Sequence, residues 1–108
     1  MAELTTHVLD ILRGVPAAGM RIDLVRDDQI TRTFWTNANG RTDTPLLTKD
    51  EFRAGRYQLI FYVGDYFQIE GTPFLDRVPI WFGVADSTQH YHVPLVVSPW
   101  AYQTYRGS

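Results

Sequence analysis

Hydrophobic and polar residues alternate with a period of two along much of the chain, as in Tyr57-Leu59-Phe61-Val63 and Val78-Ile80-Phe82-Val84. Successive side chains of a strand point to opposite faces of a sheet, so this pattern predicts strands with one buried face. The repeating positions are mostly β-branched, aromatic or leucine residues, which favour strands. The expected strands cover residues 5–11, 21–24, 30–36, 57–63, 78–84, 90–97 and 100–105.

Turn signals separate these segments. They are Gly14-Val-Pro-Ala-Ala-Gly19, Asp27-Asp28, Asn37-Ala-Asn-Gly40 and Ser98-Pro99. Seven or eight short strands at this spacing predict an all-β fold, an antiparallel sandwich of two sheets packed face to face. At 108 residues the chain has room for a single core. We therefore expect one domain over residues 1–108.

Two short stretches between the strands favour helical turns. Residues 65–70, followed by Gly71 and Pro73, predict one or two helical turns with a glycine C-cap. Residues 48–52 predict an isolated turn, because Gly55 follows too soon for a longer helix.

Composition narrows the function. A net charge of −2 with no basic run argues against nucleic-acid binding. With no cysteine, the chain has no disulfide, thiolate nucleophile or cysteine-ligated zinc. No apolar run reaches the roughly 20 residues of a membrane span, and the first residues lack the pattern of a signal peptide. We therefore expect a cytoplasmic protein without a membrane partner.

The alternation assigns side chains to faces. His7 and Leu9 share one face of the first strand, and Val8 lies on the other. In residues 90–97 both faces are largely apolar, although one face should be solvated in a monomer. We expect another subunit to cover the face with the histidines, which would then lie in a groove between chains. The two faces carry His90, His92, Pro94 and Val96, and Tyr91, Val93, Leu95 and Val97.

Each polar candidate also has an ordinary structural interpretation. His7 could be a packed or surface residue, and His90, which follows a loop, could be solvated. His92 lies further into the strand, where exposure should be lower. Arg41 follows the Asn39-Gly40 turn, where an arginine is usually a solvated loop charge. The hydrophobic pattern does not decide between these interpretations and a functional one.

The last four residues, Tyr105-Arg106-Gly107-Ser108, follow an apolar and aromatic segment. Termini usually fray, but a strand that extends to its last residue can bring a tyrosine, a guanidinium and a free carboxylate into one site. The alternative is an ordinary last strand with a solvated tip.

Taken together, these segments resemble the transthyretin-related family, specifically its enzymatic branch, the 5-hydroxyisourate hydrolases of purine catabolism. The resemblance spans nearly the whole chain, and the terminal tetrapeptide is absent from hormone-carrying transthyretins. It implies His7, Arg41, His92 (rather than His90) and residues 105–108 as site residues. It also implies a homotetramer, a dimer of dimers with active sites in the channel between them. The matching segments are Leu4-Thr-Thr-His-Val-Leu-Asp10, Gly14-Val-Pro-Ala-Ala-Gly19, Thr36-Asn-Ala-Asn-Gly-Arg-Thr-Asp43, Pro73-Phe74-Leu75, His90-Tyr-His-Val-Pro-Leu-Val-Val-Ser-Pro-Trp100 and Tyr105-Arg-Gly-Ser108.

The family's reaction opens the six-membered ring of 5-hydroxyisourate at its N1–C6 amide. The product is 2-oxo-4-hydroxy-4-carboxy-5-ureidoimidazoline. No metal or organic cofactor is implied, and the spacing of the histidines does not match a metal-binding motif. Imidazole, with an ordinary pKa of about 6.5, suits general acid–base catalysis near neutral pH. We expect His7 and His92 to share water activation and proton delivery, in an order that the sequence leaves open.

The other residues have supporting roles in this hypothesis. Arg41 would bind the acyl and oxyanion oxygens through its planar guanidinium. Ser108 would orient one imidazole, and Tyr105 would contact the substrate ring. Arg106 would anchor the terminus by an ion pair, with Gly107 also part of that anchor.

Two other classes of protein fit the sandwich. One is a carrier whose channel binds an apolar ligand without reacting, and the other is an adhesion or interaction module. Two histidines and an arginine on covered faces argue against both, since a carrier channel favours apolar walls and an interaction module needs no such polar group.

Overall fold

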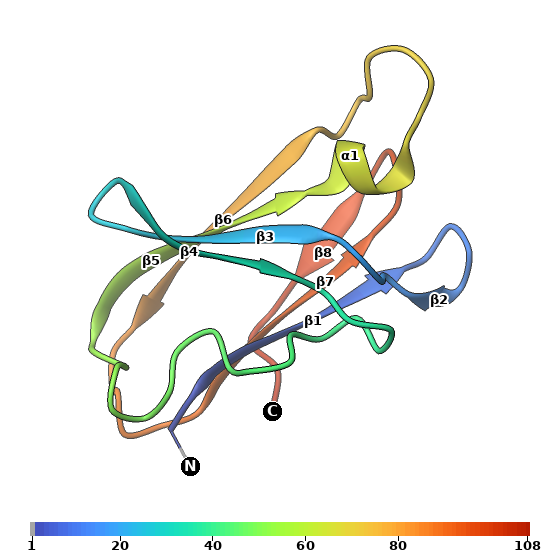
Figure 1. Ribbon diagram of the computed structural model, residues 1–108. Coiled ribbons are helices and arrows are strands. Elements are labelled where there is room, and N and C mark those ends of the chain that lie inside the picture. Colours follow the sequence, from blue (N-terminus) through green and yellow to red (C-terminus); the bar gives the residue numbers. More distant parts are fainter. Residues whose placement is uncertain (1) are drawn as a thin grey trace.

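The computed structural model describes residues 2–108, which form two four-stranded sheets packed face to face (Figure 1). The strand orders are β2-β1-β7-β8 and β4-β3-β5-β6. The predicted sandwich of seven or eight strands with one short helix is confirmed. The elements are β1 (Leu4–Asp10), β2 (Val15–Pro16), β3 (Arg21–Arg26), β4 (Gln29–Trp35), β5 (Gly55–Tyr62), α1 (Val63–Phe67), β6 (Arg77–Val84), β7 (Tyr91–Val97) and β8 (Tyr102–Thr104).

The core lies between the sheets, where the alternating apolar residues meet. In β1 every second residue is buried, beginning with Leu4 and including Val8, and the residues between them are half-buried. Ile22 and Leu24 of β3 are buried beside Leu59 of β5, because those strands are paired in register. Removing these side chains from water supplies the main driving force for the fold.

The β3–β4 hairpin turns on two aspartates. Asp27 and Asp28 both have positive φ, 54° and 62°, which is the conformation of a two-residue type I′ turn. Aspartate tolerates this region because its short side chain can hydrogen-bond locally. The turn expected at these residues is confirmed.

One strand pair departs from the expected antiparallel arrangement. β1 and β7 are neighbours at the centre of their sheet and run parallel, whereas every other pair of named strands is antiparallel. Parallel neighbours need a long connection, and some eighty residues separate these two strands. Local alternation and turn signals carry no information about a pairing between such distant segments, so the sequence pattern missed it.

The helix is displaced from the expected residues 65–70. α1 begins at Val63, buries Val63, Gly64 and Phe67, and ends with Gln68 in the left-handed conformation at φ 53°. Core contacts outweigh the sequence signal, so the expected cap at Gly71 is wrong. Among residues 2–108, no helix is long and apolar enough to cross a membrane.

Two further boundaries differ from expectation. The 14–19 segment is not only a turn, because Val15 and Pro16 pair with the end of β1 as the short strand β2. The expected strand at 100–105 is reduced to Tyr102–Thr104. Its first residues instead form a turn, in which the Ser98 backbone N–H donates to the carbonyl of Ala101. The turn at 48–52 is confirmed by the Phe52 N–H donating to the Thr48 carbonyl.

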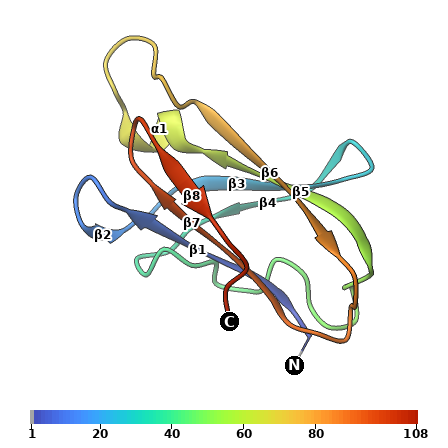
Figure 2. The same cartoon turned by 180° about the vertical axis from the view of Figure 1, so that it is seen from behind.

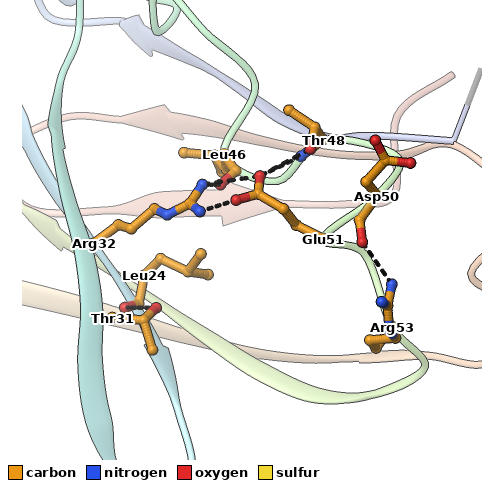
Figure 3. Close-up of polar contacts among 8 residues, drawn as sticks. All are labelled: Leu24, Thr31, Arg32, Leu46, Thr48, Asp50, Glu51 and Arg53. Atoms are coloured by element: carbon orange, nitrogen blue, oxygen red, sulfur yellow. Dashed lines mark hydrogen bonds and ion pairs between the residues drawn. The ribbon is translucent and has the colours of Figure 1, made fainter.

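The long segment between β4 and β5, residues 36–54, runs beside β1 (Figures 1 and 2). Backbone hydrogen bonds join it to β1, from Leu4 N–H to the Leu47 carbonyl at 3.0 Å and from Leu46 N–H to the Leu4 carbonyl at 2.8 Å. Arg32 of β4 pairs with Glu51, whose carboxylate also accepts from the Thr48 N–H (Figure 3). These contacts fix the segment that carries Arg41.

Candidate active site

A cavity of about 420 Å³ lies where β1, β7, the segment after β4 and the C-terminus meet. Three of the predicted site residues line it: Arg41, His92 and Ser108. The complete lining consists of Thr5, Thr6, Arg41, Thr42, Asp43, Thr44, Pro45, His90, His92 and Ser108.

The parallel register of β1 and β7 places the imidazoles. Thr5 is opposite His92, and His7, two residues along β1, is opposite Pro94. Thr5, His7 and His92 are half-buried on the side of the sheet that faces away from the core. The face assignment made from alternation is therefore confirmed. His7 is not part of the cavity lining, but lies beside it.

Arg41 is positioned by the Asn37–Gly40 turn. The Asn37 side-chain oxygen accepts from the Asn39 and Arg41 N–H groups. Gly40 is buried against β1, where its carbonyl accepts from the Val8 N–H at 2.8 Å. A Cβ at position 40 would lie 2.4 Å from the Val8 carbonyl oxygen, and φ there is +74°. Only glycine fits this approach, which brings the next residue to the histidines.

The C-terminal residues pair with β7 across His92. The Gly107 N–H donates to the His92 carbonyl at 2.7 Å, and a Cβ on Gly107 would lie 2.6 Å from His92 Cδ2. Arg106 donates to the His90 carbonyl and to Gln89 Oε1, and its guanidinium lies 3.9 Å from the centre of the Tyr91 ring. These contacts anchor the terminus through neutral acceptors and a cation–π contact, in place of the expected ion pair.

Tyr105 lies apart from this cavity. It is 55% exposed and lines a second, largely apolar cavity of about 150 Å³, together with Trp81 and Phe82 of β6. Within one chain it therefore does not meet Arg41 or His92. Its contact with substrate stays a prediction.

Electrostatics keeps both site imidazoles neutral. Burial lowers the pKa of His92 below its ordinary 6.5, and the charge of Arg41, followed by His7 and His90, lowers it further. Burial and then Arg41 also lower the pKa of His7, while a hydrogen bond to the Asn39 backbone acts in the opposite direction. At neutral pH both rings therefore carry an unprotonated nitrogen that can accept a proton.

Sequence reasoning missed Thr5. Its hydroxyl oxygen lies 2.8 Å from His92 Nδ1 and 3.2 Å from His90 Nε2, so it joins the two histidines that the sequence treated as alternatives. The signal was available, since Thr5 shares the alternating face with His7. The cavity wall from Thr42 to Pro45 was also missed, because no periodicity marks these loop residues.

The arrangement can bind a small polar molecule and exchange protons with it. Arg41 supplies a permanent positive charge and His92 supplies a neutral base. The threonine hydroxyls of the wall can donate and accept hydrogen bonds. Within residues 2–108, the His, Asp and Glu side chains do not form a group of three or more that could hold a metal ion.

The fold and the cavity define the class of protein, a transthyretin-like β-sandwich with a polar site beside its β1–β7 pair. The model of the HIUase/Transthyretin family matches residues 4–107. The chain belongs to that family.

Proteins similar to this chain include 5-hydroxyisourate hydrolases and a transthyretin. The 5-hydroxyisourate hydrolase of Mesorhizobium japonicum is 54% identical over 97% of this chain and 91% of its own length. The solved 5-hydroxyisourate hydrolase of Klebsiella pneumoniae superimposes with a TM-score of 0.84 at 36% identity, covering 98% of this chain and 99% of that one. Sea bream transthyretin in complex with thyroxine gives a TM-score of 0.83 at 28% identity, covering 97% and 94%.

Proposed function

We propose that this protein hydrolyses 5-hydroxyisourate to 2-oxo-4-hydroxy-4-carboxy-5-ureidoimidazoline in the degradation of urate. The observation that carries the proposal is a neutral imidazole, His92, in one cavity with Arg41 and Ser108. Relatives that bear the hydrolase name match this chain over nearly its full length. A carrier of apolar ligands has no use for this polar lining.

In the proposed reaction, water attacks the C6 carbonyl while an imidazole accepts one of its protons. The C6 oxygen takes the electron pair of the carbonyl bond, which gives a tetrahedral intermediate. When this intermediate collapses, the N1–C6 bond breaks. The imidazolium returns the proton to N1, and C6 remains attached to the product as a carboxyl group, which releases its proton to solvent and becomes a carboxylate. General acid–base help of this kind contributes roughly 10²–10⁴-fold.

Arg41 stabilises the negative charge that develops on the C6 oxygen. Its guanidinium presents two parallel N–H donors to adjacent oxygens, which an ammonium cannot reproduce. His7 shares the proton transfers with His92, since the same Arg41 charge lowers the pKa of both rings. Ser108, at the cavity wall, orients an imidazole through its carboxylate or hydroxyl.

The proposed active unit is a homotetramer, in which a second sandwich closes the open side of the site. Large apolar side chains are exposed just after β1, Ile11 at 54% and Leu12 at 49%, and just after β7, Trp100 at 64%. Burying them between subunits would exclude water from the cavity and bring Tyr105 of a neighbouring copy toward it. Light scattering after size-exclusion chromatography tests this by measuring the molar mass in solution. A monomer that turns over substrate would contradict the proposal.

The function is tested by generating 5-hydroxyisourate in situ from urate with urate oxidase and following its ultraviolet decay. The protein should accelerate the decay well beyond the spontaneous rate. Arg41→Lys should lose most of that acceleration, about 10²-fold in kcat, while the oligomer survives. Decay at the spontaneous rate, together with tight binding of an apolar ligand, would instead establish a carrier.

A further inference from the structure

Thr5 lies between two histidines at hydrogen-bond distance from both. Its hydroxyl oxygen is 2.8 Å from His92 Nδ1 and 3.2 Å from His90 Nε2, and all three residues line the cavity. A hydroxyl donates one hydrogen and accepts others, and a neutral imidazole protonates only one of its two nitrogens. When the rings are neutral, both contacts can be hydrogen bonds in three ways.

The three arrangements differ in the state of His92 Nε2, the ring nitrogen that does not contact Thr5. In the first, His92 Nδ1–H donates to Thr5, which donates to His90 Nε2, and His92 Nε2 keeps a free lone pair. In the second, both donations are reversed and His92 Nε2 carries a hydrogen. In the third, His92 Nδ1–H and His90 Nε2–H both donate to the Thr5 oxygen, and His92 Nε2 again keeps its lone pair. In the first two arrangements the hydroxyl couples the tautomer of one ring to that of the other.

The surroundings of His92 favour the arrangements that leave a lone pair on Nε2, and the first of these also gives the Thr5 hydrogen an acceptor, His90 Nε2. Gly107 covers the Cδ2 edge of the ring and Thr5 occupies Nδ1, so Nε2 at the tip is the nitrogen left for the cavity. Arg41 lines the same cavity, and its positive charge disfavours an N–H, with its partial positive charge, at His92 Nε2. Asp43, the carboxylate of the cavity wall, accepts a hydrogen bond from Asn37 Nδ2 at 3.0 Å and not from His92.

We propose that Thr5 is a positioning residue that holds His92 in the Nδ1–H tautomer, with His90 as the acceptor at the end of the chain. The Nε2 lone pair of His92 is then available to accept a proton from water. His90 acts through Thr5, as the acceptor of its hydrogen. The catalytic part of this inference rests on the hydrolase function proposed above, whereas the tautomer does not.

Long-range proton–nitrogen NMR spectra of the whole protein test the tautomer directly. They are recorded at about pH 8.5, two units above the ordinary pKa of imidazole, with His92 assigned by its absence in His92→Gln. We expect a protonated Nδ1 and an unprotonated Nε2 in the unsubstituted protein. A protonated Nε2 overturns the proposal without any need for a variant.

Substitution of Thr5 separates positioning from packing. Thr5→Val keeps the shape but removes the hydroxyl, and should turn His92 to a mixture of tautomers and lower kcat about 10-fold or more, with KM changed less than about twofold. Thr5→Ser should restore both. Thr31→Val is the matched control, because that hydroxyl donates to the Leu24 carbonyl on the other sheet, and it should change neither (Figure 3).

The outcomes distinguish this inference from the function. If the unsubstituted protein fails to accelerate the decay, the hydrolase proposal fails, while the spectra still decide the tautomer. If it is active and Thr5→Val matches it in spectrum and kcat, Thr5 has no positioning role and the function stands.

Discussion

The two sheets carry contrasting polar clusters on the faces that point away from the core. On the β4-β3-β5-β6 sheet, the carboxylate of Asp23 is fully buried. It accepts hydrogen bonds from Tyr62 Oη and Thr33 Oγ1 at 2.7 Å each and from Arg21. On the β2-β1-β7-β8 sheet, His7 and His92 are half-buried near Arg41, and His92 lines an open cavity.

The pKa values show what this difference means. Burial would raise the pKa of Asp23, but hydrogen bonds from Tyr62, Thr33 and Arg21 outweigh it and the pKa lies below its ordinary 3.8. At His92, burial and the positive charge of Arg41 both disfavour the protonated ring. The pKa of His92 is therefore also lowered, which favours its neutral form. The first cluster is saturated by its own partners and stabilises the fold. The second keeps unused capacity for a ligand.

The largest effect should come from the unsaturated cluster. His92→Ala should lower kcat by about 10²–10⁴-fold, the range for a general base, with little change in Tm because the ring is only half-buried. His90→Ala, which removes only the end of the Thr5 chain, should be far milder. Steady-state decay of 5-hydroxyisourate measures both. Equal losses would show that the choice of His92 over His90 is wrong.

The saturated cluster should respond in stability instead. Asp23→Ala leaves the Tyr62 and Thr33 hydroxyls without their buried acceptor and should cost about 2–3 kcal/mol of unfolding free energy. For a domain of this size that is a Tm decrease of roughly 10 °C. Below the transition kcat should stay within about twofold. Urea unfolding and kinetics at 20–25 °C check both, and a large kcat loss in the folded variant would contradict the division between the two faces.

A smaller change tests the link between the terminus and the base. Gly107→Ala introduces a Cβ that would lie 2.6 Å from His92 Cδ2, so the ring or the terminus must shift. We expect kcat to fall by about 10-fold, since a misplaced catalytic group costs up to about 10²-fold. Gly83→Ala is the matched control, because its Cβ meets nothing within 4 Å and Gly83, like Gly107, does not have a positive φ. Equal kcat in the two variants would dissociate the terminus from His92.

The mildest test is pH, because the two faces titrate in different windows. Folding lowers the pKa of His92, so the folded protein loses stability as pH falls below about 6.5 through the lower folded value. Protonation over the same range also removes the catalytic base. The acid limb of kcat/KM should therefore have a midpoint below 6.5. Asp23, with a lowered carboxyl pKa, loses its stabilising effect only as pH falls below 3.8 through its folded value. A kinetic midpoint above 6.5 would contradict a neutral His92 base.

Much of the sandwich was predictable, because alternation in strands such as β1 and β5 reports directly which side chains face the core. The Asp27-Asp28 hairpin was predictable for the same local reason. The errors lie where contacts between distant segments outweigh local signals. The helix begins earlier than expected because Val63 and Phe67 are buried in the core. The parallel β1–β7 pair joins strands that are far apart in the chain.

The candidate site divides in the same way. Alternation assigned His7 and His92 each to a face of its own strand, and the family resemblance put them in one site with Arg41 and the terminus. Nothing local indicated that Tyr105 would lie with Trp81 in another cavity, or that Thr5 would join His90 to His92. These relations depend on the register between strands and on how the chain end returns to β7.

The order of residues by itself determined which side chains are apolar, which positions turn, and which chemical groups each face carries, because these follow from side-chain chemistry and a period of two. The meeting of Arg41, His92 and Ser108 around one cavity was decided only by tertiary structure. Gly40 docking on Val8 and Gly107 pairing with His92 bring together residues that are 32 and 15 positions apart in the chain, and only the packed sandwich specifies those contacts.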